Sequence, residues 1–313
     1  MSKKIAVVCG PTACGKTALA VELALALDGE VVSADSMQVY RKLDIGTAKP
    51  AGEEKKGVPH HMLDVADPSE DWSVARYVMD AAPIVDDILS RGRLPIVAGG
   101  TGLYIDALIA GREFAPFAPD SGLRRELERR TEAEGLEVLY RELERADPEA
   151  AVRIHPNDRK RIIRALEVYY TSGKTISQHD RETKALPPRY DAVKVGLRFA
   201  DRADMRERID ARVDEMFARG LVEEVRELAA VLSPDCTAMQ AIGYKELSAA
   251  LREGRSPEEA RDEIKLRTRQ YAKRQLTWFR RDESIGWYEW GKTPKISDAL
   301  LFSTGFLKAH GIR

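Results

Sequence analysis

The chain has 313 residues, of which 43% are apolar, and its 50 basic and 51 acidic side chains give a formal net charge of −1. This length allows one large or two ordinary domains with a sizeable core, and the near-neutral charge does not by itself indicate a nucleic-acid partner. Its three cysteines, Cys9, Cys14 and Cys236, form no C-x-x-C or Cys/His cluster, which argues against a disulfide framework and against a zinc site.

The N-terminal residues Met1–Lys4 lead directly into the first predicted strand, which leaves no room for a signal peptide. No stretch approaches the roughly 18 consecutive apolar residues of a transmembrane helix. We therefore expect a cytoplasmic protein without a membrane partner.

A phosphate-binding motif follows the first predicted strand. The apolar run Ile5–Cys9 indicates a buried strand, and the alanine- and leucine-rich segment Ala18–Leu27 indicates a helix. Between them stands G-x-x-x-x-G-K-T, the P-loop pattern. The predicted loop consists of Gly10, Pro11, Thr12, Ala13, Cys14, Gly15, Lys16 and Thr17. The alternative is a glycine-rich turn that only connects a strand to a helix.

The residue types of this loop suit a polyphosphate. Gly10 and Gly15 allow several backbone N–H groups to point into one concavity at a helix N-terminus. Lys16 supplies a full charge to the outer phosphate, and Thr17 offers a hydroxyl to the Mg²⁺ ion that usually accompanies phosphate oxygens. Cys14 has either a lowered pKa or the role of a plain spacer. The loop does not reveal which phosphate compound it holds.

The second predicted strand, Glu30–Ser36, delivers the carboxylate of Asp35. Ligands of parallel sheets lie beyond the carboxyl ends of the strands, so we expect Asp35 to face the same crevice as Lys16 and to serve as an acid or base. The alternative is an Asp that only caps a helix or a turn. An ordered loop is expected over Asp44–Pro50. For the pair His60–His61 a hydrogen-bonding role is preferred to metal binding, because no third ligand is evident.

The next predicted elements are a helix over Ser73–Leu89 and a strand over Leu94–Ala98. Ser73 is the expected N-cap of the helix, and Pro83 should kink or interrupt it. The strand leads into the small-residue turn Gly99–Gly102, where Thr101 either donates a hydroxyl to phosphate or caps a helix. No apolar run ends in the Asp or Asp-Glu expected of the second metal site of nucleotide-hydrolysing P-loop proteins, and Val31–Asp35 comes nearest to that pattern.

Beyond Pro116 and Pro119 the pattern changes to helices only, and Val193–Phe199 then restores a strand. Predicted helices in between cover Ser121–Glu134, Leu136–Ala146, a short segment from Pro148, and Asp158–Tyr170. We therefore predict an α/β fold: a parallel sheet core like that of P-loop NTPases, residues 1–116 and 191–313, with an inserted all-helical domain, residues 117–190.

The C-terminal part is predicted to be mostly helical. Helices are expected over Asp204–Arg219, over Leu221–Leu232, after the segment Gln240–Lys245, and from Ser256 to about Arg281; a strand around Trp287–Trp290 and a terminal helix follow. Arg208 lies near the start of the first of these helices. It either reaches the phosphate or forms a surface ion pair.

Charge is segregated along the chain. Lys265–Arg281 contains seven basic residues and no acidic one, with aromatic residues interleaved, whereas Asp64–Asp87 contains seven acidic residues and one arginine. This distribution predicts a polyanion on one face, with Lys273 and Arg274 on its phosphates; the alternative is a solvated basic helix face.

Four segments in combination resemble the bacterial tRNA dimethylallyltransferases, also called tRNA isopentenyl transferases. They are Gly10–Thr17, Ser33–Tyr40, Asp44–Pro50 and Ala98–Tyr104. The resemblance continues through Pro59–His61, Arg161–Glu167, Gln240–Lys245 and Thr268–Gln275, and so covers nearly the whole chain.

The resemblance implies transfer of a dimethylallyl group from dimethylallyl diphosphate to N6 of adenosine 37, beside the anticodon of tRNA. By resemblance, Asp35 is the general base, Thr101 and Arg208 join the P-loop and a Thr17-bound Mg²⁺ in holding the leaving diphosphate, and the helical domain contacts tRNA. The tRNA contacts carry over to Asp35, Ser36, Met37, Gln38, Thr101, Arg124, Arg159, Lys160, Arg161, Ile162, Ile163, Gln240, Ala241, Ile242, Gly243, Tyr244 and Lys245. We expect a monomer that binds the anticodon stem-loop.

Three other functions remain open. A small-molecule kinase would use the P-loop for ATP and would not need tRNA. A prenyltransferase acting on a free adenine nucleotide would need neither the helical insertion nor the basic C-terminal helix. A non-catalytic tRNA-binding module would be indifferent to the loss of the Asp35 carboxylate.

Overall fold

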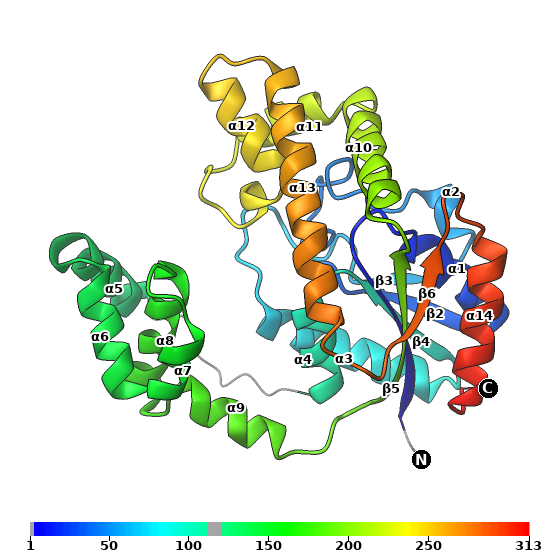
Figure 1. Cartoon of the computed structure of the whole chain (residues 1–313), viewed down its shortest axis with the longest axis horizontal. Coiled ribbons are helices and arrows are strands. Elements are labelled where there is room, and N and C mark those ends of the chain that lie inside the picture. Colours follow the sequence, from blue (N-terminus) through cyan, green and yellow to red (C-terminus); the bar gives the residue numbers. More distant parts are fainter. Residues whose placement is uncertain (1–2, 112–120, 313) are drawn as a thin grey trace. The chain divides into compact units, whose positions relative to one another are not determined.

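The computed structural model describes residues 3–111 and 121–312 of the chain. The chain divides into two compact units, residues 1–111 with 189–313, and residues 112–188 (Figure 1). The predicted boundary at Pro116 and the start of the predicted insertion, residues 117–120, lie outside the described residues. Among the described residues, no helix is long and apolar enough to cross a membrane.

The first unit is built on a sheet of six strands in the order β3-β2-β4-β1-β5-β6. β1 is Lys4–Cys9, β2 is Gly29–Ser33, β3 is His60–His61, β4 is Leu94–Gly99, β5 is Asp191–Phe199 and β6 is Gly286–Trp290. Every neighbouring pair is parallel. Parallel strands are covered on both faces and are therefore apolar throughout, which is why Ile5–Cys9 of the central β1 is fully buried. The predicted α/β class with a parallel sheet is confirmed.

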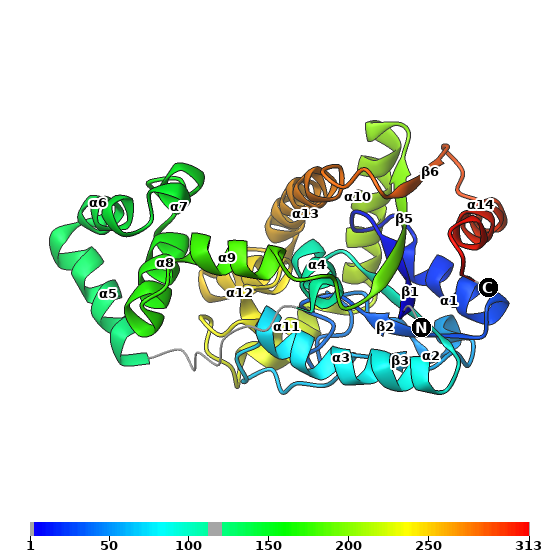
Figure 2. The same cartoon turned by 90° about the horizontal axis from the view of Figure 1, so that it is seen from below.

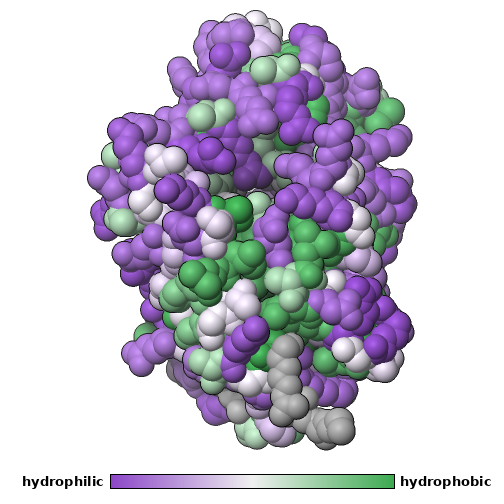
Figure 3. Space-filling view, turned by 90° about the vertical axis from the view of Figure 1, so that its right-hand side faces the viewer, coloured by the Kyte–Doolittle hydropathy of each residue, from purple (hydrophilic) through white to green (hydrophobic). Residues whose placement is uncertain are grey.

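Helices cover both faces of this sheet. Figure 2 shows α1 (Lys16–Ala26) and α14 (Ile296–Ala309) on one side and α3 (Val74–Ser90) and α4 (Gly102–Ala110) on the other. Leu19 and Leu23 of α1 join Ala299 and Leu307 of α14 in one hydrophobic cluster against the sheet. The face that carries α1 and α14 also bears exposed hydrophobic surface, coloured green in Figure 3.

The remaining helices of the first unit lie beyond the carboxyl ends of the strands or follow β5. They are α2 (Gly52–Lys55), α10 (Arg202–Ala218), α11 (Leu221–Ala229), the 3₁₀ turn η1 (Ala238–Gln240), α12 (Tyr244–Arg252) and α13 (Pro257–Phe279). α13 packs against α10, α12 and α4. All but the last two residues of the basic segment Lys265–Arg281 therefore belong to a helix that contacts several parts of this unit.

The described part of the second unit contains helices only. They are α5 (Ser121–Glu134), α6 (Leu136–Ala146), α7 (Pro148–Arg153), α8 (Arg159–Ser172) and α9 (Ile176–Lys184). Leu127, Leu139, Leu143, Ile162 and Leu166 form a hydrophobic cluster within this unit. It therefore has a core of its own, as an independent helical domain requires.

Several sequence predictions need correction. α3 is one helix through Pro83, so an interruption there was wrong. Proline removes the hydrogen bond to the carbonyl of Met79, but Pro83 and Met79 are both exposed and water can satisfy that carbonyl. The sequence analysis missed α2, β3 and α9, whose short or polar sequences lack a clear apolar period. The predicted N-cap Ser73 is confirmed, since its side chain accepts a bond from Arg76 N.

A buried carboxylate joins three strands at the opposite end of the sheet from the P-loop. Glu30, on β2, is 2% exposed, and it accepts bonds from Arg91 and Arg93, which both lie just before β4. His61 Nε2 on β3 lies 2.8 Å from Glu30 Oε2. His60 Nδ1 lies 2.8 Å from the carbonyl of Val58. The hydrogen-bonding role expected for both histidines is therefore confirmed.

Replacing Glu30 with glutamine should destabilise the protein in a pH-dependent way. The bonds from Arg91 lower the pKa of Glu30 to about 2 against the opposing effect of burial. Because the folded pKa is depressed, the stabilisation is complete above the unfolded value of about 4.3 and is lost as the pH falls toward the folded one. We expect Glu30→Gln to lower Tm by roughly 3–6 °C at neutral pH, since two guanidiniums lose their shared partner.

Thermal unfolding of both proteins at neutral pH and at about pH 3 checks this expectation, because the difference should shrink at the lower pH. Glu53→Gln, a change at an exposed residue of α2, is the matched control and should leave Tm unchanged. A Tm difference of equal size at both pH values would contradict the assignment of charge to Glu30.

Candidate functional site

The carboxyl ends of β1, β2 and β4 bring three predicted site segments together. Residues 10–17 follow β1, Asp35 follows β2, and Gly99–Thr101 ends β4. β1 pairs with β4, and β4 pairs with β2, so the three strand ends are adjacent. A cavity of about 360 Å³ lies here, lined among others by Lys16, Thr17 and Asp35. The expectation that Asp35 faces the same crevice as Lys16 is confirmed.

The P-loop backbone has the strained geometry that its glycines permit. Gly10 has a φ of 142°, and a Cβ there would lie 2.3 Å from the carbonyl oxygen of Leu197. Gly15, with a φ of 83°, is the N-cap of α1. No larger residue could occupy Gly10 without moving β5. The loop therefore lies at the N-terminus of α1, where an anion is favoured.

Two side chains that are distant in the sequence, one on a helix and one on a strand, bind this loop. The amide of Gln275, on α13, accepts a bond of 2.8 Å from Thr12 N and donates one of 2.9 Å to the carbonyl of Gly100. The indole of Trp290, on β6, donates a bond of 2.8 Å to the carbonyl of Cys14. Both residues are buried. The loop is therefore preorganised before any ligand binds.

Lys16 and Cys14 differ in what they offer the cavity. Lys16 is half-buried, and its Nζ donates a bond of 2.6 Å to the carbonyl of Pro11, within the loop itself. An anion in the cavity can compete for this ammonium group. Burial raises the pKa of the Cys14 thiol, and the opposing charge of Lys16 is a smaller effect. The lowered pKa considered for Cys14 is therefore wrong, because the thiol faces the core.

Asp35 is held by a turn and at the same time faces the cavity. Its Oδ1 accepts bonds of 2.9 Å from Met37 N and 3.4 Å from Gln38 N. These bonds bear out the turn role considered for Asp35, and they fix the orientation of the carboxylate. Asp35 lines the first cavity and also a second cavity of about 280 Å³ beside it.

Thr101 orients the segment that carries Asp35. It is the N-cap residue of α4, as the sequence allowed, although its side chain makes no capping bond to that helix. Instead its Oγ1 accepts a bond of 3.1 Å from Ser36 N. The end of β4 is thereby linked to the turn after β2.

Two arginines of α10 line the first cavity. Arg208, which the sequence predicted, is exposed, and Arg212 lies one turn further along and lines both cavities. Burial lowers the pKa of the Arg212 guanidinium, while the Asp35 carboxylate acts in the opposite direction. Sequence reasoning missed Arg212. The signal was its spacing of four residues from Arg208, which puts both on one helix face.

The second cavity collects several of the residues predicted to contact tRNA. It is lined by Ser36 and Met37 beside Asp35, and by Gln240–Gly243, which precede α12. Tyr271 and Arg274 of α13 complete one wall, and the Arg274 guanidinium lies 5.7 Å from the centre of the Tyr271 ring. Gln38 lines the first cavity instead. Lys245 is exposed, whereas the Tyr244 side chain is buried and points to Glu224.

The other predicted tRNA contacts belong to the second unit. Arg124 on α5 and Arg159–Ile163 on α8 lie on two helices that pack together. Arg159, Lys160 and Arg161 are exposed, whereas Ile162 and Ile163 belong to the core of the unit. The buried carboxylate of Glu167 accepts a bond of 2.7 Å from Arg164 and lies 3.9 Å from Arg124. The exposed basic side chains of α8 therefore lie among carboxylates, since Arg159 pairs with Glu132 and Arg161 with Asp158.

Comparisons with known proteins agree with this arrangement. The family model described as IPP transferase matches residues 38–282, and the model described as isopentenyl transferase matches residues 3–69. Two curated relatives are named tRNA dimethylallyltransferase. The one from Acetivibrio thermocellus is 48% identical over 98% of each chain, and the one from Geobacter sulfurreducens is 50% identical over 92% of each chain.

Solved structures agree as well. The tRNA isopentenylpyrophosphate transferase of Bacillus halodurans is 42% identical with a TM-score of 0.73, over 99% of this chain and 98% of the other. A eukaryotic dimethylallyltransferase described as acting on tRNA is 31% identical with a TM-score of 0.81, over 98% of this chain and 80% of the other. The resemblance seen in the motifs is confirmed, and the chain belongs to the IPP transferase family, among relatives named tRNA dimethylallyltransferase.

Proposed function

We propose that this enzyme transfers a dimethylallyl group from dimethylallyl diphosphate to N6 of adenosine 37 in the anticodon loop of tRNA, releasing diphosphate. One observation carries the proposal. Asp35 lines both the cavity that contains Lys16 and Thr17 and the neighbouring cavity that contains Gln240–Gly243. A carboxylate between a diphosphate cradle and a second substrate cavity suits transfer of a group from one substrate to the other.

The cradle lowers the barrier by binding the leaving group. Cleavage of the allylic carbon–oxygen bond builds negative charge on diphosphate and positive charge on carbon. The loop amides and Lys16 are proposed to bind the negative charge on diphosphate, and Arg208 and Arg212 of α10 line the same cavity. Groups that are fixed before the reaction stabilise developing charge without reorganisation. Thr101 contributes by fixing Ser36 next to Asp35.

Mg²⁺ is the proposed cofactor. Among the described residues, no group of three or more His, Cys, Asp or Glu could hold a metal by itself. Mg²⁺ usually keeps several waters and binds through one or two protein ligands and substrate phosphates. The hydroxyl of Thr17, in the first turn of α1 on the cavity wall, fits this mode of binding. The ion, when bound with diphosphate, neutralises charge on the leaving group.

Asp35 is the proposed general base. Adenine N6 is a poor nucleophile until its proton can leave, and a carboxylate in hydrogen-bond reach accepts that proton as N6 attacks carbon. Two backbone amides already hold Oδ1 of Asp35, so the direction of the carboxylate is fixed.

The target adenosine must leave the stacked anticodon loop to reach Asp35. The second cavity offers the aromatic and apolar side chains of Tyr271, Ile242 and Met37, as expected for an unstacked base. The basic side chains of α13 and the helical unit with Arg124 and Arg159–Arg161 are proposed to bind the RNA backbone. We further propose that the enzyme is a monomer and acts in the cytoplasm, where its tRNA substrate is found.

Replacing Asp35 with asparagine should separate binding from catalysis. Asparagine keeps an oxygen that accepts the bonds from Met37 N and Gln38 N, but it cannot take a proton from N6. We expect kcat to fall by about 10²-fold or more, with the Kd for tRNA unchanged. Steady-state prenylation and tRNA binding measure these two quantities. Asp87→Asn, at an exposed site on α3, is the control. Full turnover by Asp35→Asn would refute the role of general base.

Replacing Arg274 with glutamine should weaken RNA binding through lost phosphate contacts. Arg274 is exposed beside the second cavity, and each lost contact lowers the slope of log K against log salt by about 1. Titration of an anticodon stem-loop over a range of salt concentrations measures that slope. Arg226→Gln, on the exposed side of α11, is the matched control. An unchanged affinity and slope for Arg274→Gln would exclude Arg274 as a phosphate contact.

A further inference from the structure

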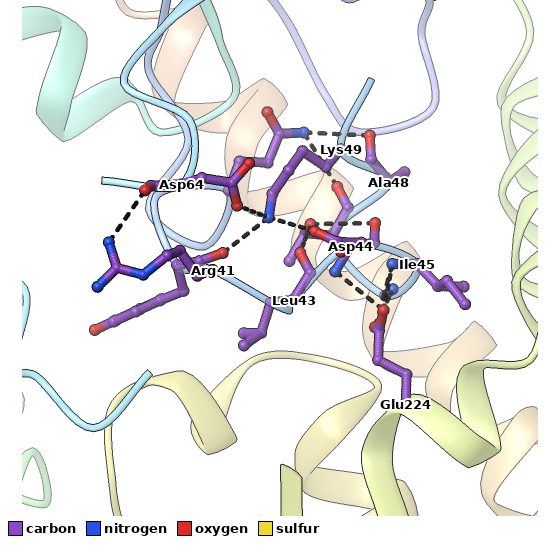
Figure 4. Close-up of polar contacts among 12 residues, drawn as sticks. Arg41, Leu43, Asp44, Ile45, Ala48, Lys49, Asp64 and Glu224 are labelled. Atoms are coloured by element: carbon purple, nitrogen blue, oxygen red, sulfur yellow. Dashed lines mark hydrogen bonds and ion pairs between the residues drawn. The ribbon is translucent and has the colours of Figure 1, made fainter. Parts of the chain in front are cut away.

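The loop Asp44–Pro50 forms a wall shared by the two cavities. Thr47, Ala48, Lys49 and Pro50 line the first cavity, and Gly46 and Thr47 line the second. This loop contains no helix or strand, so side chains must satisfy much of its backbone. Figure 4 shows the polar contacts that do so.

A single carboxylate binds three successive amides of this loop. Glu224, on α11, accepts bonds from the N–H groups of Asp44 at 3.1 Å, Ile45 at 2.8 Å and Gly46 at 3.1 Å (Figure 4). Consecutive N–H groups that converge in this way form a concave anion site. Here the anion is a side chain of the protein itself, so the loop conformation depends on its negative charge.

The same carboxylate also binds the start of α12. The phenol of Tyr244 donates a bond of 2.5 Å to Glu224 Oε1. Burial raises the pKa of Tyr244, and the charge of Glu224 adds to this effect, so the phenol keeps the proton that it donates. The Tyr244 ring packs against Gly46 so closely that a Cβ at Gly46 would lie 2.5 Å from it. Tyr244 directly follows Gln240–Gly243 of the second cavity.

From the other side, two residues tie the loop to the segment that carries Asp35. Lys49 is buried, and its Nζ donates bonds to Tyr40 O at 2.8 Å, to Asp44 Oδ1 at 2.5 Å and to Asp64 Oδ1 at 2.6 Å. Gln38 Nε2 donates bonds of 3.1 and 3.3 Å to the carbonyls of Thr47 and Ala48. The N–H of Gln38 in turn donates to Asp35.

We propose that Glu224 is a positioning residue for the transfer reaction. Through the loop Asp44–Pro50, Glu224 couples Tyr244, beside the cavity for the acceptor adenosine, to Gln38 and Asp35. This inference rests on the proposed function. Glu224 is not among the described residues that line either cavity, so it acts through the loop. The P-loop is supported separately, by Gln275 and Trp290. Loss of Glu224 should therefore disturb the acceptor and the base, while the P-loop and Lys16, which Glu224 does not contact, keep most of the affinity for diphosphate.

Glu224→Gln tests the proposal. Glutamine has the same shape but presents an NH₂ group to amides that need an acceptor. We expect kcat/KM for tRNA to fall by about tenfold or more, faster hydrogen exchange at the amides of residues 44–46, and a Kd for inorganic diphosphate within about twofold of the wild type. Glu223→Gln, the exposed neighbour on α11, is the matched control and should match the wild type throughout.

Tyr244→Phe is a second variant that keeps the ring against Gly46 and removes only the hydroxyl. It should lower kcat/KM for tRNA by about threefold. In the double variant with Glu224→Gln the loss should be smaller than the product of the two single losses, because both substitutions affect the same hydrogen bond. If Glu224→Gln does not fold, Tyr244→Phe decides the question.

Wild-type kinetics in either variant, or a parallel loss of diphosphate binding and acceptor kinetics, would overturn the proposal. A wild-type protein that prenylates no tRNA would instead refute the proposed function. Hydrogen exchange tests the structural role of Glu224 even if the protein prenylates no tRNA. Amides of residues 44–46 that exchange as slowly in Glu224→Gln as in the wild type would refute that role.

Discussion

The buried amide of Gln275 connects the two halves of the site. It is the only side chain for which the described contacts join Thr12 of the P-loop, Gly100 at the end of β4 and the basic helix α13 at once. A Cβ at Gly100 would lie 2.2 Å from Gln275 Nε2, so the glycine is needed for this approach. An amide can donate and accept simultaneously, which no carboxylate or ammonium group can do. Gln275 thereby fixes the position of the basic helix α13 relative to the P-loop.

Positively charged side chains line the first cavity, and Asp35 lies where the two cavities adjoin. Lys16, Arg208 and Arg212 line the cavity proposed for diphosphate, and Asp35 is the carboxylate that both cavities share. Burial lowers the pKa of the Arg212 guanidinium and the charge of Asp35 raises it, so Asp35 favours the ionised form of Arg212. This arrangement suits the proposed attack on carbon.

Local sequence was sufficient for the strand, P-loop and helix at the N-terminus, because those residues are contiguous and their apolar period is clear. It was also sufficient for Asp35, since the carboxyl ends of parallel strands meet at one edge. It was insufficient for Glu224, because Glu224 and its partner Ile45 in the loop Asp44–Pro50 are 179 residues apart in the sequence. Arg212 was missed because an arginine in a surface ion pair and a partly buried arginine on a cavity wall have the same sequence pattern. Pro83 was overinterpreted because its exposure, which makes it tolerable, depends on the tertiary structure.

The most direct test of the account is incubation of the protein with labelled dimethylallyl diphosphate, Mg²⁺ and unmodified tRNA, followed by nucleoside analysis. The account predicts N6-dimethylallyladenosine at position 37, no labelling of free AMP, and loss of the product when EDTA removes the metal. Unaltered tRNA, together with transfer of the terminal phosphate of ATP to a small molecule, would contradict it.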